Sequence, residues 1–266
     1  LAAFPDRLLL GEDVIWSGDL TRGFSSHRIT SPMTNLGGTQ FGPATGRTVR
    51  TMNIADCEIT NHQITGEWLF RDNLALVNQL GIPVADAVDV IAGRFDDSLA
   101  AWLRREFNRV METRQAPAPS LGHDKPDPME AFARRVLENC WINGNADELE
   151  QLYAPYCVLH RAPVRIFSGL GDTLRHYGEW RRTFPDARIQ VDHVCSQVHG
   201  RDGRHVAARW SLAATHAGAF GGMAPSGNPV YLCGVSHWRL LNDAIVAEWT
   251  VFDEISLMAQ SRSAII

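Results

Sequence analysis

The distribution of apolar and polar positions predicts strands in the first part of the chain and helices in the middle. Residues 8–16, 25–31, 48–59 and 64–70 are rich in Val, Ile, Thr and Trp, which predicts four strands. A short helix is expected at 72–80. From residue 84 to about 112 the apolar positions recur at helical spacing, with a break at 96–98. Four prolines within 115–128 then predict an extended linker.

The last part of the chain combines both patterns. Helices are predicted at 129–141, just after Asn145, and at 172–183, with a strand at 157–161 between the last two. Four further strands are predicted at 188–198, 204–215, 230–240 and 245–252. Three helices followed by a curved antiparallel sheet form an α+β cone. A ligand pocket would lie between the concave face of the sheet and the helices.

One segment occurs twice and indicates the domain organisation. Residues 66–72 recur at 247–253, and both copies contain Glu-Trp and a closing Asp. At this offset of 181 residues, 12 of the 52 pairs formed by 28–79 and 209–260 are identical, which indicates a tandem duplication of one domain. The predicted units are a first domain at 1–82, connecting helices and linker at 83–126, and a complete second domain at 127–266. The first domain holds only a sheet half, so its helical half is expected to be missing from this sequence.

The duplication predicts an α+β fold with two cone-shaped domains, each a curved antiparallel sheet packed on helices. A duplicated surface naturally makes a self-complementary contact. The two sheets are therefore predicted to pack face to face as an intrachain pseudo-dimer. Further homo-oligomerisation stays open at this point.

Composition narrows the function classes. The chain is 45% hydrophobic and 21% charged, as expected for a soluble globular protein, and its net charge of −5 argues against nucleic-acid and anionic-membrane partners. No apolar run approaches the ~20 residues that span a bilayer. The five cysteines have no metal-type spacing and indicate reduced thiols of a cytoplasmic protein. Three histidines crowd one hairpin, but no cysteines or carboxylates accompany them at metal-ligand spacing, so no metal or other cofactor is predicted.

Four segments of the second domain carry a resemblance to a known family. They are residues 158–160 (Val-Leu-His), 184–186 (Phe-Pro-Asp), 215–218 (Thr-His-Ala-Gly) and 245–253, which contains Glu-Trp and ends in Asp. In order and spacing they resemble the SnoaL-like polyketide cyclases of the nuclear-transport-factor-2-like superfamily, which also includes ketosteroid isomerases and limonene epoxide hydrolases. The resemblance implies a cofactor-free enzyme that closes a ring by aldol condensation, with an Asp as general acid and base.

The chain departs from the family pattern at that Asp. The matching position is Ser236 in the second copy and Ala55 in the first. Asp56 and His237 are the next residues, but successive residues of a strand point to opposite faces, so only a bulge would bring them into the pocket. We therefore predict that the Asp-dependent ring closure is not the activity of this protein.

The resemblance also suggests which residues would form a site. The candidate catalytic residues are His216, Ser236 and Asp253, and the candidate ligand-binding residues are His160, Trp141, Tyr153, Trp180, Trp238 and Trp249. Most of these residues have a structural alternative. His216 can be a loop histidine that caps a strand, and His160 can be a histidine bonded to a neighbouring backbone carbonyl. The aromatic residues can be ordinary core, and Asp72 and Asp253 can cap helices.

Other repeated residues favour a structural role. Glu67 and Glu248 would point away from the neighbouring tryptophans and pair with Arg28 and Arg209 across strands. Two functions remain. One is a cyclase, isomerase or hydrolase acting on a small, apolar, oxygenated substrate. The alternative is a binding module that holds a small molecule or a protein partner without turnover.

Overall fold

The computed structural model describes residues 2–112, 127–161 and 165–266, and an α+β fold is confirmed. The first four strands form one antiparallel sheet in the order β1-β2-β3-β4. Their bounds are β1 Leu10–Gly18, β2 Arg22–Thr34, β3 Thr48–Thr60 and β4 Gln63–Arg71. The four predicted strands are therefore present, with each end within about three residues of its prediction.

Local chemistry fixes the end of this sheet. Asn61 and His62 both have left-handed backbone angles (φ 49° and 65°), so they form the tight turn that joins β3 to β4. Asp72 then caps α1 (Asn73–Leu80) by accepting a hydrogen bond from the Ala75 amide at 2.8 Å. Gly81, with φ 73°, ends the helix in the left-handed conformation that glycine adopts without strain.

The middle of the chain is helical, as predicted. It contains α2 (Val84–Ala92) and α3 (Asp97–Glu112), which are separate helices. Leu103 and Val110 of α3 pack against Ala213 and Tyr231 of the second sheet. Most of the linker predicted from its prolines lies outside the described residues.

The second sheet has six strands in the order β6-β5-β10-β9-β8-β7. Their bounds are β5 Tyr153–Arg161, β6 Arg165–Ser168, β7 Arg188–Val198, β8 Arg204–Thr215, β9 Pro229–Leu241 and β10 Ala244–Phe252. The sheet is not wholly antiparallel, because β10 pairs with β5 in parallel. The purely antiparallel prediction was wrong at this pair, since helix α6 lies between β5 and the later strands and the chain returns in the same direction.

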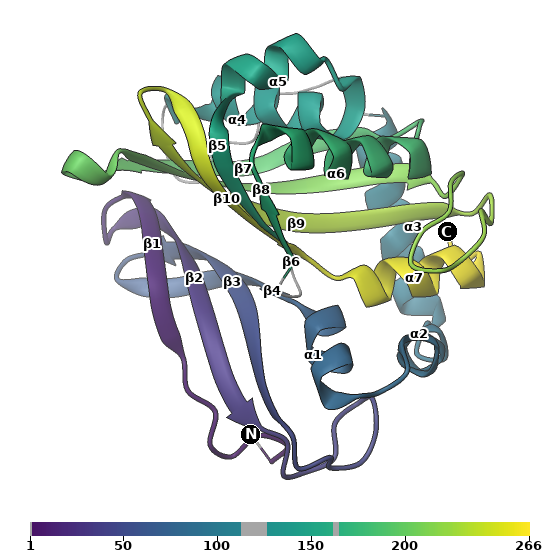
Figure 1. Cartoon of the computed structure of the whole chain (residues 1–266). Helices are drawn as coiled ribbons and strands as arrows, with labels where there is room; N and C mark the ends of the chain where they lie inside the picture. Colours follow the sequence, from purple (N-terminus) through teal and green to yellow (C-terminus); the bar gives the residue numbers. More distant parts are fainter. Residues whose placement is uncertain (1, 113–126, 162–164) are drawn as a thin grey trace.

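One face of the second sheet is covered by helices (Figure 1). They are α4 (Glu130–Glu138), a π-helical turn η1 (Asn139–Asn143), α5 (Ala146–Leu152) and α6 (Leu170–Thr183), and a short 3₁₀ turn η2 (Gly200–Asp202) joins β7 to β8. The largest apolar core lies between these helices and the sheet. Trp210 fills its centre by lying over Gly234, where a Cβ atom would come within 2.6 Å of the indole ring. The last helix, α7 (Glu254–Ser263), follows β10 and packs on α2.

The other face of the second sheet contacts the first sheet (Figure 1). Ile54 and Phe70 of the first sheet pack with Val235 and Val251 of the second. Polar groups also meet across this contact: Asp56 accepts a hydrogen bond from Arg209 at 2.9 Å. The interface between the sheets is thus apolar with a buried ion pair inside it.

Two arginines at positions 181 residues apart make reciprocal contacts across the interface. The Arg28 guanidinium lies 3.8 Å from the ring centroid of Trp249, and that of Arg209 lies 3.7 Å from the ring centroid of Trp68. The predicted pairing of these arginines with Glu67 and Glu248 was therefore wrong. In each strand Trp faces the other sheet, so its neighbour Glu faces away from both arginines.

No helix of the described residues is long and apolar enough to cross a membrane.

Candidate functional site beneath the helices of the second sheet

A carboxylate lies in the aromatic core of the second sheet. Glu248 on β10 is 1% exposed and accepts hydrogen bonds from the hydroxyls of Tyr153 and Tyr177, each at 2.5 Å. The Thr250 hydroxyl donates a third hydrogen bond at 2.6 Å. A buried carboxylate is costly unless such donors compensate it, and here strand β5, helix α6 and strand β10 supply one each.

The two tyrosines remain donors. Burial raises the pKa of the Tyr153 and Tyr177 hydroxyls well above the usual value, and the charge of Glu248 raises both further. Each hydroxyl therefore keeps its proton and directs it at Glu248. The geometry makes a carboxylate with two attached acids inside the apolar core between the helices and the sheet.

The predicted catalytic Ser236 is connected to this carboxylate. It is buried on β9, bonds to the Thr250 hydroxyl at 2.8 Å and accepts a hydrogen bond from Trp210 Nε1 at 3.1 Å. The β8–β9 pairing runs without a bulge, so His237 points the other way and meets Ser26 of the first sheet. Ser236 thus extends the polar chain from Glu248, through Thr250, towards the middle of the sheet.

An arginine enters the same core, and among the described residues it makes no ion pair with a carboxylate. Arg161, at the end of β5, is 2% exposed, and its Nε and Nη1 atoms have no hydrogen-bond partner among the described residues. Its guanidinium lies 4.2 Å from the ring centroid of Phe252 and 5.7 Å from those of Trp141 and Trp180. Burial lowers its pKa, although the nearby charges of Glu254 and Glu248 oppose that shift.

His176 of α6 adds a neutral imidazole to this core. Burial and the charges of Arg161 and Arg165 lower its pKa to about 2. Its Nε2 atom has no partner among the described residues, and the ring packs on Phe167 with a centroid distance of 4.4 Å. Arg165 itself pairs with the buried Glu254. The core around Glu248 therefore holds charged groups of both signs, and atoms of Arg161 and His176 that have no hydrogen-bond partner among the described residues.

His216 lies elsewhere. It follows β8, bonds through Nδ1 to Ser226 at 3.0 Å, and lines a cavity of about 380 Å³ together with Val88 of α2 and Met258 of α7. Burial lowers the pKa of its imidazole. The structure does not bring His216 into the network of Glu248 and Ser236, because the long loop after β8 directs it towards α2 and α7.

Asp253 has the helix-capping position. Its carboxylate accepts hydrogen bonds from the amides of Ile255 and Ser256 at 3.0 and 3.2 Å, and one from the Asn73 side chain at 2.6 Å. The capping alternative is therefore confirmed for Asp253, as it is for Asp72. All of its close polar contacts serve the start of α7 and the junction with α1.

His160 and Trp249 face the first sheet rather than the helices. They are paired in the β5–β10 ladder and stack with a centroid distance of 5.0 Å. Both line a cavity of about 530 Å³ between the sheets, together with Glu12 and Arg50. His160 was expected to point into the cone, and the strand parity explains the difference, since its neighbour Arg161 takes the inward position.

The other predicted ligand-binding aromatic residues are core residues around Glu248. Trp141 contacts Trp180 and Trp210 with ring centroids 5.2 and 5.1 Å apart, and Trp238 and Tyr153 are each 1% exposed. Trp141 and Trp238 leave their indole N–H groups without partners among the described residues. They are core residues that surround Glu248 and Arg161.

Sequence reasoning missed the roles of Glu248, Arg161 and His176. Glu248 was visible in the repeat, but its strand was assigned the opposite orientation. Arg161 follows His160 directly, so reversing the parity of one strand corrects both residues together. His176 lies one residue before Tyr177 on α6 and gave no signal of its own.

Comparisons with known proteins agree with the resemblance for the second sheet. Residues 131–261 match the family model described as SnoaL-like polyketide cyclase, which includes no residue of the first sheet. No curated protein sequence matches the chain.

Similar solved structures cover about half of the chain. One is described as a SnoaL-like polyketide cyclase from Jannaschia sp. CCS1, with 20% identity and a TM-score of 0.44, covering 54% of this chain and 99% of that chain. IdmH from Streptomyces antibioticus, described as a polyketide cyclase, has 24% identity and a TM-score of 0.42, covering 50% and 97%. TsrD from Streptomyces laurentii has 16% identity and a TM-score of 0.44, covering 52% and 99%.

Proposed function

We propose that residues 127–266 form a SnoaL-like, cofactor-free acid–base enzyme acting on a small, mostly apolar substrate that carries a carbonyl oxygen. The observation that supports this most is the Glu248 carboxylate, held by Tyr153 and Tyr177 inside the aromatic core. Arg161 enters the same core, and its Nε and Nη1 atoms have no hydrogen-bond partner among the described residues. Positioned acid–base catalysis needs this combination of a proton acceptor and a group that stabilises negative charge.

The proposed chemistry is proton transfer at a carbon next to a carbonyl. Glu248 would accept the carbon-bound proton, and the guanidinium of Arg161 would bind the oxygen on which negative charge develops. Aldol ring closure and double-bond isomerisation both begin with this step. Ser236 takes the place of the family Asp and would serve as a hydrogen-bonding link to Thr250. A serine hydroxyl is far too weak a base for the step itself.

The alternative function is a binding module without turnover. It is favoured by the three hydrogen bonds that Glu248 already accepts, because a carboxylate so engaged also serves to hold strand and helices together. In that case the domain would bind an oxygenated ligand through Arg161 and would catalyse no reaction.

The decisive test compares Glu248→Gln with Glu67→Gln. Glu67 is the residue 181 positions earlier, and it is exposed, so it is a matched control. We would incubate the protein in D₂O with a panel of polyketide-like, steroid and other cyclic ketones, and follow deuterium exchange next to the carbonyl by NMR. We expect Glu248→Gln to lose about 10²–10⁴ of the rate, while Glu67→Gln keeps the parent rate. Ligand binding without exchange in the parent protein would favour the binding module. Exchange that survives Glu248→Gln would reject Glu248 as the base.

We also propose that the chain arose by tandem duplication and that the contact between its sheets imitates a homodimer. Reciprocal stacking of Arg28 on Trp249 and Arg209 on Trp68 supports this. The five cysteines are free, which supports a reducing, cytoplasmic environment.

A further inference from the structure

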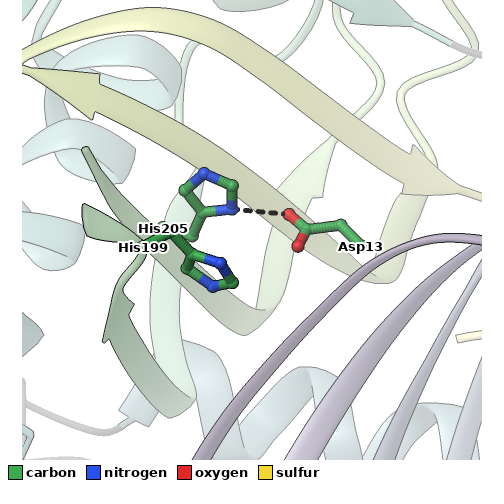
Figure 2. Close-up of side chains that lie close together, drawn as sticks. All are labelled: Asp13, His199 and His205. Atoms are coloured by element: carbon green, nitrogen blue, oxygen red, sulfur yellow. Dashed lines mark hydrogen bonds and ion pairs between the residues drawn. The ribbon is translucent and has the colours of Figure 1, made fainter. Parts of the chain in front are cut away.

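Three metal-binding side chains from two sheets meet at one edge of the interface. Asp13 of β1, His199 before η2 and His205 of β8 each offer one ligand atom, and these atoms all lie within 4.8 Å of one another (Figure 2). Only His199 and His205 are close in sequence. Asp13 comes from the other sheet, so no ligand spacing along the chain announces the cluster.

Two features of the cluster suit a metal ion. The Nδ1 atom of His205 lies 2.9 Å from Asp13 Oδ2, so these two atoms are already close together, and a metal ion would take the place of the proton between them. The His199 ring stacks beside His205 with a centroid distance of 4.2 Å, and its Nε2 atom is buried without a partner among the described residues. A tetrahedral zinc ion with bonds of about 2.0–2.2 Å holds its ligands roughly 3.3 Å apart, so small side-chain rotations would close the site.

The surroundings of His205 match those of a metal ligand. Its second ring nitrogen, Nε2, lies 3.2 Å from Asp202 Oδ2. Arg239 in turn donates to Asp202 Oδ1 at 3.1 Å. Histidines that bind metals usually donate their other N–H to a carboxylate, which fixes the ring and the tautomer. His193, the third histidine of this hairpin, pairs with Asp56 instead and is not part of the cluster.

We infer that Asp13, His199 and His205 form a binding site for a divalent cation of the zinc class, with a fourth position left for water. Two imidazoles and one carboxylate are ligands that zinc and cobalt accept. Because Asp13 belongs to the first sheet and the histidines belong to the second, the ion would tie the two sheets together. The simpler alternative is an ion pair of protonated His205 with Asp13 and Asp202.

Cobalt binding to the tag-free, chelator-treated full chain tests the site. We expect one Co²⁺ per chain, with the visible absorption of a tetrahedral complex, and displacement of that Co²⁺ by Zn²⁺. His199→Ala and Asp13→Asn should each weaken binding by at least about 10-fold, and Asp202→Asn by about 10- to 100-fold. His62→Ala is the control, because His62 is exposed on the β3–β4 turn and should not change binding.

Thermal unfolding gives a second measurement. Zn²⁺ should raise the Tm of the parent protein and of His62→Ala, and leave the Tm of His199→Ala unchanged. If Asp13→Asn does not fold, His199→Ala decides alone, since its ring is only half-buried and takes no other side-chain partner among the described residues. Absence of stoichiometric binding, or binding that His199→Ala leaves unchanged, would overturn the site and leave the ion pair as its explanation.

Discussion

Glu67 and Glu248 occupy matching positions in the two sheets, and their environments are opposite. Glu67 on β4 is exposed, whereas Glu248 on β10 is 1% exposed and accepts three hydrogen bonds. Both strands direct Trp towards the sheet interface and Glu away from it. The difference arises because helices α5 and α6 lie over the outward side of the second sheet (Figure 1), where Tyr177 of α6 reaches Glu248. Around Glu67 the outward face of β4 is exposed, as Thr65 and Leu69 are too. Identical strand patterns can thus produce a solvated surface or a buried site.

The two arginines show a second asymmetry. Arg209 bonds to Asp56, whose side chain is 2% exposed, while Arg28 bonds to Glu12, whose side chain is 32% exposed. Burial raises the pKa of Asp56, but the hydrogen bond from His193 and the charge of Arg209 outweigh it and leave the pKa lowered. Arg28 and Arg209 therefore stack on tryptophan in the same way, but the carboxylate partner of Arg209 is more deeply buried than that of Arg28.

The largest expected effect tests this difference in depth. Asp56→Ala should destabilise the protein by about 3–5 kcal/mol, because it leaves the Arg209 charge buried without its partner. Glu12→Ala should cost about 1 kcal/mol or less, since water can replace the exposed partner of Arg28. Urea unfolding of both variants at pH 7 measures the comparison. Equal losses of unfolding free energy would contradict the claim that the burial of an ion pair sets its contribution to stability.

The capping aspartates give the next largest effect, through pH. Burial raises the pKa of Asp72 from 3.8 to about 7. Because the folded-state pKa lies above the unfolded one, this group's contribution is fully present below pH ~4 and is lost as pH rises to ~7. Asp72→Asn keeps a capping side chain and should gain about 2–4 kcal/mol over the parent at pH 8, with little difference near pH 4.

Asp253→Asn is the matched variant for that experiment. The pKa of Asp253 is also raised by burial, but the Asn73 side chain donates a hydrogen bond that lowers it in part. We expect a smaller gain at pH 8 than for Asp72→Asn. Unfolding curves between pH 5 and 8 measure both, and a pH-independent gain in either variant would contradict the linkage.

The smallest effect concerns the two matching turns. His62 and Asp243 both have positive φ, at 65° and 62°. His62→Gly should stabilise the protein by up to about 1 kcal/mol, because glycine adopts this conformation without a Cβ clash. Asp243→Gly should gain less, since a short polar side chain already tolerates it. Urea midpoints measured side by side check the order, and a loss in His62→Gly would show that its side chain contributes contacts worth more than the strain.

Much of the fold followed from local patterns. Period-2 alternation was clear in the strands now seen as β8 and β9, and Val206, Trp210 and Leu212 do share the core face with Trp238 and Leu240. Turn and capping residues predicted the hairpin ends and the start of α1, because those conformations depend on a few adjacent residues. The short strand β6 was not predicted, since four residues next to a loop carry too little periodicity.

The candidate site was only half visible in the sequence. The residue types were present, but alternation alone does not state which face of a strand is covered by helices. Assigning β10 the wrong way round put Glu248 with the arginines, and assigning its partner strand β5 the wrong way round put His160 inside the cone. One correct contact, such as Trp249 on Arg28, reverses all of these assignments together.

The sequence by itself determined the strands other than β6, the main helices, the repeat and the family resemblance of the second part, because each depends on residues near one another in the chain or on order along it. Only the tertiary structure decided that Glu248 meets Tyr153 and Tyr177, and that Asp13 meets His205. Those contacts join residues between 71 and 192 positions apart. Their proximity results from how sheets and helices pack, and no local pattern encodes that distance.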